Sequence, residues 1–235
     1  MPGTMAQPAQ RFSGFDPKAL RLLSALEKHN DRAWFAPRKE RFESELLGPL
    51  TWLVEDASAA LGRAKIPIGG DRKRSIFRIY RDVRFSSDKS PYKAHVSAYL
   101  SYDGGRLTPG GIYIHVQPKR SFLSIAFYRI EKPMLQRWRA SMAADPARFT
   151  RVVRALEKKH LRVIPPEDDE DSLARMPRGF EAHAQSPLAP YFRLRNFCTH
   201  VDLEDREVTL PSLVTRIVDL ARDAKPLLDF GWSLD

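Results

Sequence analysis

The sequence predicts an α+β protein with a mostly antiparallel sheet and helices packed on one of its faces, in a single domain. Two observations predict this class. Apolar residues recur at helical spacing in the first and last parts of the chain, whereas residues 76–128 switch to the alternation typical of strands. The connections between those strands are short, and short connections join antiparallel neighbours.

Length and composition are those of a globular protein. The chain has 235 residues, of which 43% are hydrophobic and 29% charged. No apolar run approaches the roughly 18–20 residues that cross a bilayer, so no membrane partner is expected. The start, "MPGTMAQPAQ", has no basic segment followed by an apolar core, and we interpret residues 1–11 as a disordered tail before a domain over 12–235. With Cys198 as the single cysteine, an intramolecular disulfide is excluded and a cytoplasmic setting is expected.

The first part of the chain has the pattern of helices. Asp16-Pro17 is a helix-start signal, and a leucine stripe from Leu20 to Leu26 follows it. In "HNDRAWF", Asn30 and Asp31 are expected to cap the next helix, whose Trp34 and Phe35 would pack into the core. Helical spacing continues over 38–61, where Pro49 should kink or divide the helix.

The central part has the pattern of strands, expected at 76–85, 94–102, 111–117 and 121–128. The breakers "SSDKSP", "DGGRLTPG" and "QPKRS" separate them. Helices are then expected at 132–143 and 146–160, an acidic proline-rich loop at about 164–190, and another strand at 197–203. A final helix is predicted from Pro211 to Leu228, with Thr209 as its cap.

Alternation along each strand divides the side chains between two faces. In 76–85 it places Phe77, Ile79, Val83 and Phe85 toward the core and Arg78, Tyr80, Asp82 and Arg84 opposite. The other strands add His95, Ser97, Tyr99, Tyr113, His115, His200 and Asp202 to that second face. A solvated face of an antiparallel sheet accounts for the alternation, but the choice of Arg, His and Tyr also fits a recognition surface.

Positive charge is concentrated in one stretch. The formal net charge is +10, and the segment from Arg72 to Lys93 carries eight cations and only two anions. Such an excess favours an anionic partner. Two arginines on one strand face, Arg78 and Arg84, could hold a phosphate or carboxylate group beside Tyr80. The following turn would supply Lys89, Tyr92 and Lys93, and Arg178 of "MPRGFEAH" could reach the same anion.

An internal ionic network is the competing interpretation of these cations. Asp82 lies between Arg78 and Arg84 in sequence, and Asp88 could pair with Lys89 or a nearby arginine. Arg81 falls on the apolar face of the predicted strand, where it needs a buried partner or an edge position.

The histidines of the second face could serve as metal ligands or as acid/base groups. His95, His115 and His200, with Asp202, have the right chemistry for a transition metal, but no two of the histidines share a short ligand motif, so no metal site is predicted. His115 or Tyr80 could move protons near the arginines. The sequence does not determine whether a cofactor is bound.

Four segments identify a family resemblance: "HNDRAWF", "IFRIYRDVRFSSDKSPYKAH", "GGIYIHVQP" and "MPRGFEAH". Their order and spacing resemble a widespread bacterial and fungal family, the domain-of-unknown-function family 2461, from about Phe12 to Trp232. One departure is "FLSIAFYRIEKP", which lacks the glycine cluster usual in that strand of the family. The resemblance implies the extent of the domain and a cytoplasmic setting, but no mechanism.

Three functions therefore stay open. The chain could bind a small phosphate- or carboxylate-bearing ligand, act on such a ligand as an enzyme, or bind nucleic acid with Tyr80, Tyr99 and Tyr113 stacking on bases. The sequence contains no P-loop, dinucleotide fingerprint, HExxH or GxSxG motif. It does not determine the oligomeric state.

Overall fold

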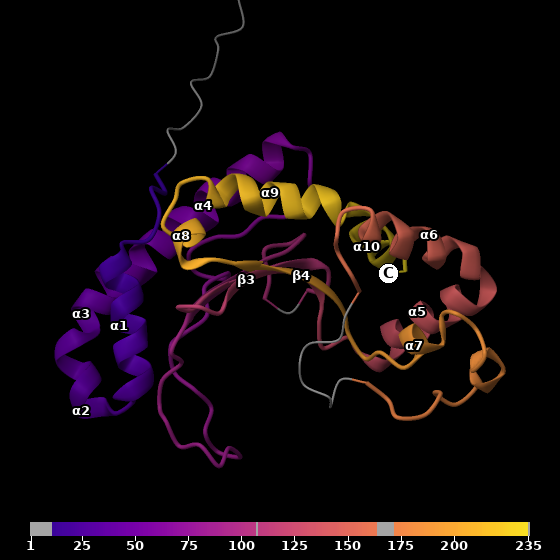
Figure 1. Ribbon diagram of the computed structural model, residues 1–235, viewed down its shortest axis with the longest axis horizontal. Helices are drawn as coiled ribbons and strands as arrows, with labels where there is room; N and C mark the ends of the chain where they lie inside the picture. The colour runs from indigo at the N-terminus through magenta and orange to yellow at the C-terminus, as the bar shows by residue number, and fades with distance from the viewer. Residues whose placement is uncertain (1–10, 107, 164–171, 235) are drawn as a thin grey trace, which may run out of the picture.

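The computed structural model describes residues 11–106, 108–163 and 172–234. Four strands form one antiparallel sheet in the order β1–β2–β3–β4: β1 (Val96–Leu100), β2 (Gly111–Val116), β3 (Ser121–Phe127) and β4 (Phe197–Leu203). Helices cover one face of this sheet and extend beyond both of its ends (Figure 1). The α+β class and the strands predicted at 94–102, 111–117, 121–128 and 197–203 are thereby confirmed.

The part before the sheet is helical, as predicted. It contains α1 (Pro17–Lys28), α2 (Arg32–Phe35), the 3-10 turn η1 (Ala36–Arg38), α3 (Lys39–Phe42), the π-helical turn η2 (Glu43–Leu47) and α4 (Gly48–Arg63). Asp16 caps α1 by accepting from the N–H of Lys18 at 2.6 Å, and Asp31 caps α2 by accepting from that of Trp34 at 2.8 Å. Pro49 lies in the first turn of α4, just after the π-helical turn, so the helical pattern of 38–61 is divided near the expected place.

The remaining helices lie after β3. They are α5 (Lys132–Ala144), α6 (Pro146–Glu157), the 3-10 turn η4 (Glu181–His183), α7 (Ala189–Phe192), α8 (Asp205–Val208), α9 (Leu213–Asp223) and α10 (Lys225–Trp232). The single final helix predicted over 211–228 is wrong, because the chain breaks at Ala224 and restarts with Pro226 in the first turn of α10. Thr209 does not cap it: its hydroxyl donates to the carbonyl of Arg206 at 2.8 Å and closes α8.

The main core lies between the sheet and helices α4 and α9, which run along its covered face in Figure 1. Pairing places Ala98, Ile114 and Leu123 side by side on three strands, and all are fully buried. Burial of such rows is the dominant stabilising contribution in a domain of this size. This face therefore has the alternation that the sequence predicted.

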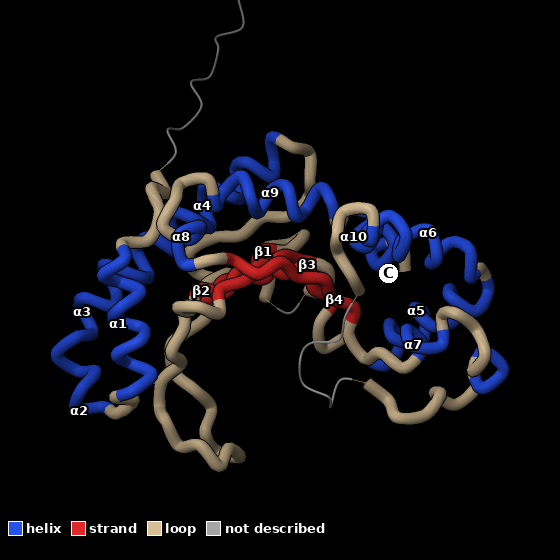
Figure 2. The backbone as a smooth tube through the Cα atoms, in the orientation of Figure 1, coloured by secondary structure: helices blue, strands red, loops and turns tan. Residues whose placement is uncertain are grey.

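The strand predicted at 76–85 is wrong. Only Ile76 forms a bridge to the sheet, opposite Ala98. The chain then leaves the sheet and pairs with its own return segment, with the N–H of Lys93 donating to Ile79 at 2.8 Å and that of Arg81 donating to Pro91 at 3.0 Å. We call residues 77–93 the hairpin arm; it extends away from the sheet in Figure 2. Most side chains beyond Phe77 are charged or polar, so the segment has little apolar surface to bury against the sheet edge.

The predicted faces of 76–85 change with this geometry. Phe77 joins a small cluster on the second face with Tyr99 and Tyr113, whereas Ile79 packs on the main core. Phe85, near the tip of the arm, is 95% exposed. Neither Phe77 nor Phe85 therefore contributes to the main core as predicted.

Segments far apart in sequence meet at two places. The N–H of Phe15 donates to the carbonyl of Val208 at 3.0 Å, and the indole N–H of Trp232 donates to that of Gly110 at 3.2 Å. Gly14, at φ +104°, passes so close to the other segment that a Cβ there would lie 2.1 Å from the carbonyl oxygen of Thr209. A side chain would therefore clash with the backbone at this contact.

Two predictions fall largely outside the described residues. These are the tail at 1–11 and the first part of the loop at 164–190, including the acidic run "EDDED". Arg11 is described, and its N–H donates to the carboxylate of Asp56 at 2.7 Å. None of the described helices combines the length and apolar character needed to cross a membrane.

Candidate functional site

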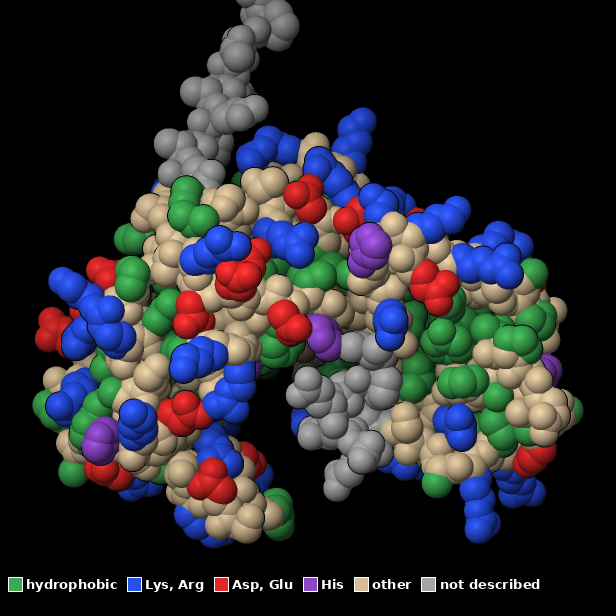
Figure 3. Space-filling model, in the orientation of Figure 1, with side chains coloured by type: hydrophobic (Ala, Val, Ile, Leu, Met, Phe, Trp, Pro, Cys, Tyr) green, Lys and Arg blue, Asp and Glu red, His purple; other side chains and the backbone are tan. Residues whose placement is uncertain are grey.

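The second face of the sheet carries the polar and aromatic residues that alternation predicted for β1, β2 and β4. Ser97, His115 and Phe122 lie side by side across β1, β2 and β3. In Figure 3 an open gap lies beneath the sheet beside the hairpin arm. We use the term histidine face for His95, Ser97, Tyr113, His115 and Phe122.

Rings of the histidine face pack against one another. The ring centroids of His95 and His115 are 4.1 Å apart, and those of His115 and Phe122 are 4.8 Å apart with nearly parallel planes at 14°. Phe122 continues the row toward His200, with centroids 6.0 Å apart. A planar group could extend this row of rings by stacking or edge contact.

A chain of hydrogen bonds orients His115. Its Nε2 lies 3.0 Å from Oε1 of Gln117, and its Nδ1 lies 3.3 Å from the hydroxyl of Tyr113. With the amide oxygen of Gln117 as acceptor, Nε2 carries the proton and Nδ1 accepts from Tyr113. Burial lowers the pKa of His115 and raises that of Tyr113, so both are neutral at pH 7. The Ser97 side chain lies close enough to Tyr113 to favour its ionised form, which opposes the rise in the pKa of Tyr113.

His95 differs from His115 in having no side-chain hydrogen bond within the described part of the chain. It is only partly buried, and its ring is held by His115. Burial, together with the nearby His115 and Lys93, lowers the pKa of His95 to about 3. A neutral imidazole with unused nitrogens at a partly open surface can donate to or accept from a ligand. The geometry therefore favours His95 over His115 as the histidine that meets a ligand.

Three cations border the histidine face, and we call Arg78, Lys93 and Arg106 the cation rim. The Lys93 ammonium and the Arg106 guanidinium lie 5.5 Å and 5.8 Å from the centroid of the Phe77 ring. Partial burial lowers the pKa of Lys93, and repulsion by Arg78 and Arg106 lowers it further. Within the described residues neither Lys93 nor Arg106 has an ion pair with a carboxylate. The rim is thus a local excess of positive charge that an anion would relieve.

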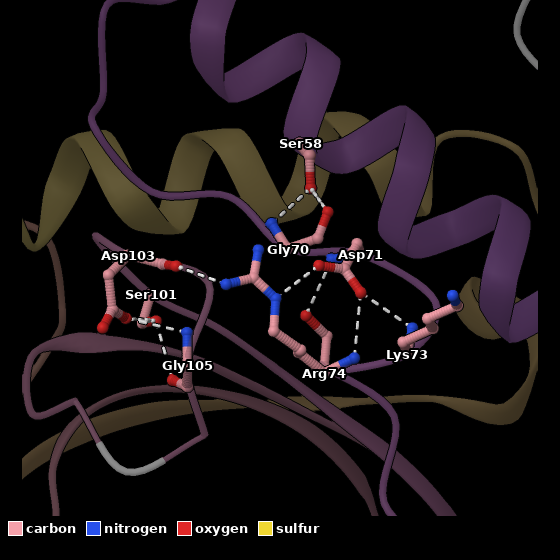
Figure 4. A network of polar contacts seen from close by, with 9 residues as sticks. Ser58, Gly70, Asp71, Lys73, Arg74, Ser101, Asp103 and Gly105 are labelled. Carbon is pink, nitrogen blue, oxygen red and sulfur yellow. Dashed lines mark hydrogen bonds and ion pairs between the residues drawn. The ribbon is translucent and has the colours of Figure 1, made fainter.

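A polar network fixes the turn that carries Arg106 (Figure 4). The carboxylate of Asp103 accepts from the hydroxyls of Ser101 and Thr108, at 3.0 and 2.7 Å, and from the N–H of Gly105 at 2.7 Å. Arg74 links this turn to the loop before the arm, donating to the carbonyl of Asp103 at 3.2 Å and to Asp71 at 2.7 Å. Arg106 itself donates to the carbonyl of Ile76 at 3.2 Å. The network therefore sets where Arg106 meets Phe77.

Four of the predicted ligand-binding residues come together: Arg78, Lys93, His95 and His115. Arg84 and Lys89 lie near the tip of the arm instead, where Arg84 pairs with Asp82 at 2.7 Å and Lys89 donates to the carbonyl of Val83 at 3.0 Å. The alternative of an internal ionic network describes this tip correctly.

The same network accounts for Arg81. It pairs with Asp88 and donates to the carbonyl of Ser90 at 3.3 Å. Asp88 thus pairs with a nearby arginine, which is one of the pairings that the ionic-network interpretation expected.

Tyr80 and Tyr92 belong to the base of the arm. Tyr92 is 7% exposed, and its ring packs 4.3 Å from that of Phe35, so it is a core residue and presents no ring to a ligand. Tyr80 lies against it, with centroids 5.6 Å apart. Asn30 does not cap a helix: its side-chain amide donates to the carbonyl of Tyr92 at 2.9 Å and accepts from its N–H at 3.0 Å.

Arg178 does not join the cation rim. Its segment, residues 172–188, lies with α5–α7 at the end of the molecule opposite the arm in Figure 1. Phe180 anchors this segment, with its ring 5.5 Å from that of Phe192. The segment that carries Arg178 is thus a surface loop anchored by Phe180.

Sequence reasoning missed Arg106 and Phe122. Arg106 stands alone in the breaker "DGGRLTPG", and only strand pairing brings it beside Phe77. Phe122 is apolar but lies on the second face because it pairs with His115, and splitting 121–128 by alternation would have found it. Tyr99 is buried and its hydroxyl contacts the carbonyl of Ala126 at 3.0 Å, which removes it as a stacking platform for bases.

Metal binding has no geometric support in the described residues. No group of three or more His, Cys, Asp or Glu side chains is arranged there to hold an ion. His200 lies 3.9 Å from the carboxylate of Asp202 rather than joining His95 and His115. The site is therefore made of hydrogen-bonding, aromatic and cationic groups.

Comparison with known proteins gives one match. The family model described as "Conserved hypothetical protein (DUF2461)" matches residues 18–230, from α1 into α10. No curated protein and no solved structure matches the chain. The match confirms the resemblance carried by the central motifs and covers every residue of the histidine face and the cation rim.

Proposed function

The chain belongs to the DUF2461 family of conserved hypothetical proteins, and we propose that it binds a small anionic ligand, bearing a phosphate or carboxylate group, on the histidine face. One observation carries this proposal. Arg78 and Arg106 both repel Lys93, and neither Lys93 nor Arg106 pairs with a carboxylate in the described residues. Such a cluster is costly unless an anion occupies it.

The remaining groups support a ligand with a planar or unsaturated part. The anionic group would contact Arg106 and Lys93, whose guanidinium and ammonium suit phosphate and carboxylate oxygens. His95, with unused ring nitrogens, would bond to the same or a neighbouring oxygen. The edge of the row formed by His95, His115 and Phe122 would contact the rest of the ligand.

The test is calorimetric titration of the full chain with inorganic phosphate and with small mono- and dicarboxylates. Arg106→Gln should lower the affinity for the anion about tenfold, because it removes a charge-assisted hydrogen bond. Arg216→Gln, an exposed cation of α9 on the far side of the sheet, is the matched control and should change nothing. Equal affinity of the Arg106 variant and the native chain would contradict the proposal.

A spectroscopic readout assigns binding to this face. Burial and the nearby positive charge of Lys93 hold His95 neutral, and an anion beside both would offset that charge, so the pKa of His95 should rise on binding. Imidazole resonances followed through a pH titration, with and without the anion, measure this shift. His95→Asn identifies the resonance.

An enzyme acting on the same ligand is the second candidate. The observation that favours it is the hydrogen-bonded pair of Tyr113 and His115, oriented by Gln117, which could move a proton beside His95. A screen of phosphate esters and carboxylate esters tests this candidate. If His95→Asn keeps anion affinity but loses turnover, the protein is an enzyme; if no compound turns over, it is a binding protein.

A further inference from the structure

A second basic surface lies between α1 and the segment from α2 to α3. It is an open depression of about 430 Å³. Its walls carry cationic and aromatic side chains, namely Lys18, Arg21, His29, Trp34, Arg38 and Arg41. No acidic side chain is among the residues that line it. Nothing in the proposed function uses this surface.

The helical repeat gathers the cations on one side of α1. Lys18, Arg21, Ala25 and His29 follow at intervals of three or four residues, which brings them onto one face. Across the depression, Arg38 and Arg41 are three residues apart and face α1 in the same way. Both walls therefore direct positive charge into one concavity.

These charges are only partly neutralised. Arg41 pairs with Glu45 at 2.9 Å and also lies near Asp16. Lys18 and Arg21 are exposed, and within the described residues their side chains have no ion pair and no hydrogen bond. Three of the four cations, Lys18, Arg21 and Arg38, are thus available to an anion.

Trp34 holds Arg38 in position. The Arg38 guanidinium lies 4.2 Å from the centroid of the Trp34 ring and donates to the Trp34 carbonyl at 2.8 Å. His29 stacks on the same indole, with centroids 5.6 Å apart and planes at 17°. A guanidinium fixed in this way keeps its remaining donors directed outward, so less entropy is lost when it binds.

We propose that this depression, which we call the α1–α3 basin, binds a phosphate group. Guanidinium forks and an ammonium match phosphate oxygens, and the openness of the basin lets the rest of the ligand stay in solvent. A phosphate monoester and the backbone of a single-stranded nucleic acid share this chemistry. The basin is separate from the histidine face, so each proposal can fail without the other.

The indole of Trp34 reports on occupancy of the basin. The full chain is titrated with inorganic phosphate, a nucleoside monophosphate and a single-stranded oligonucleotide while tryptophan fluorescence is recorded. We expect a saturable change that Trp34→Phe abolishes, although calorimetry still detects binding by that variant. The double variant Lys18→Gln, Arg21→Gln should bind at least about tenfold more weakly, because it removes two phosphate contacts and no internal contact.

One control makes the result specific. Arg216→Gln removes a cation of another surface and should leave the fluorescence titration unchanged. Tighter binding of the oligonucleotide than of the monophosphate, with a log–log salt slope of about −2 for three phosphates, would identify a nucleic-acid backbone. The reverse order would identify a phosphate monoester. If no probe gives a saturable change, or if the double variant binds as the native chain does, the proposal is wrong.

Discussion

At the scale of single residues, His95 is the most informative side chain of the site. It is a histidine kept neutral by burial and by its neighbours His115 and Lys93, and no hydrogen bond compensates its ring nitrogens in the described residues. A structural histidine in a core would have such a bond. Its position is therefore better explained by a ligand than by stability.

We expect His95 to make the fold sensitive to acid. Its pKa falls from 6.5 to about 3 on folding, so below pH 6.5 the unfolded chain binds a proton that the native chain does not. Stability is then complete above pH 6.5 and is lost progressively as the pH falls toward 3. Between pH 7 and pH 5 this residue alone would cost at most about 2 kcal/mol of unfolding free energy.

Urea unfolding at pH 7 and pH 5 measures this loss. His95→Asn should remove most of the difference in unfolding free energy between the two pH values. We expect His115, whose pKa is also lowered, to account for the remainder. The other charged groups near the two histidines, Lys93 and Arg120, stay protonated in this range. Identical pH dependence in the native chain and the variant would show that His95 is not held neutral.

The residues of the site could be predicted only in part. Arg78, Lys93, His95 and His115 follow from an unusual basic stretch and from strand alternation, which are properties of the sequence itself. Arg106 could not be found in this way, because its place beside Phe77 depends on the pairing of β1 with β2 and on the turn held by Asp103. Long-range pairing is not encoded in local periodicity.

At the scale of elements, the hairpin arm decides how the site is built. It carries Phe77, Arg78 and Lys93, yet only short stretches of backbone pairing hold its two sides together. Asn30 supplies the missing support, because its amide forms with Tyr92 the two hydrogen bonds that a neighbouring strand would form. The turn between α1 and α2 thus acts as the partner of the arm.

We expect Asn30→Ala to loosen the arm without unfolding the sheet. The loss of both hydrogen bonds should cost about 2 kcal/mol and should be felt first in the arm. Amide hydrogen exchange measures it directly, since the N–H groups of Arg81 and Lys93 are bonded only within the arm. These amides should exchange faster, whereas those of β2 should not change.

A tip substitution serves as the control. Lys89→Gln removes only the bond to the carbonyl of Val83 and should leave the exchange at Lys93 unaltered. Unchanged exchange in Asn30→Ala would mean that the packing of Tyr92 on Phe35 holds the arm by itself.

Element prediction succeeded where one face of a segment is buried along its whole length and failed at 76–85, where only the first part packs on other residues. Strands β1 to β4 alternate because helices cover one side of them. Residues 76–85 also alternate, but their charged side chains pair with one another within the arm, and the segment is not a strand of the sheet. A period of two is common to both arrangements, and only the absence of a continuous apolar row distinguishes them.

At the scale of the whole molecule, the first helix is joined to the last ones by a close backbone contact. Phe15 bonds to Val208, and Gly14 has the positive φ and the lack of a Cβ that the approach to Thr209 requires. Helical periodicity predicted α1 but did not predict α8, which carries Val208. It could not predict that they meet, because some 190 residues separate them in sequence.

Gly14→Ala should therefore destabilise the entire fold. A Cβ would lie 2.1 Å from the carbonyl oxygen of Thr209, and the residue would keep a backbone conformation that alanine disfavours. We expect a loss of about 2 kcal/mol or more, and a Tm lower by about 5 °C. Thermal unfolding followed by circular dichroism measures both.

Gly62→Ala is the matched control for that substitution. Gly62 lies in α4 with nothing within 4 Å of the Cβ position, so alanine there should stabilise the helix by about 1 kcal/mol. A Tm for Gly14→Ala equal to that of the native chain would mean that the α1 contact can shift at little cost.

The contacts of Phe15 with Val208 and of Trp232 with Gly110 also constrain how the protein is made. During synthesis, Phe15 leaves the ribosome some 190 residues before Val208 exists to accept its hydrogen bond, and Gly110 likewise precedes Trp232. These two contacts therefore cannot form until α8 and α10 have been made. We expect this part of the fold to be completed late in synthesis.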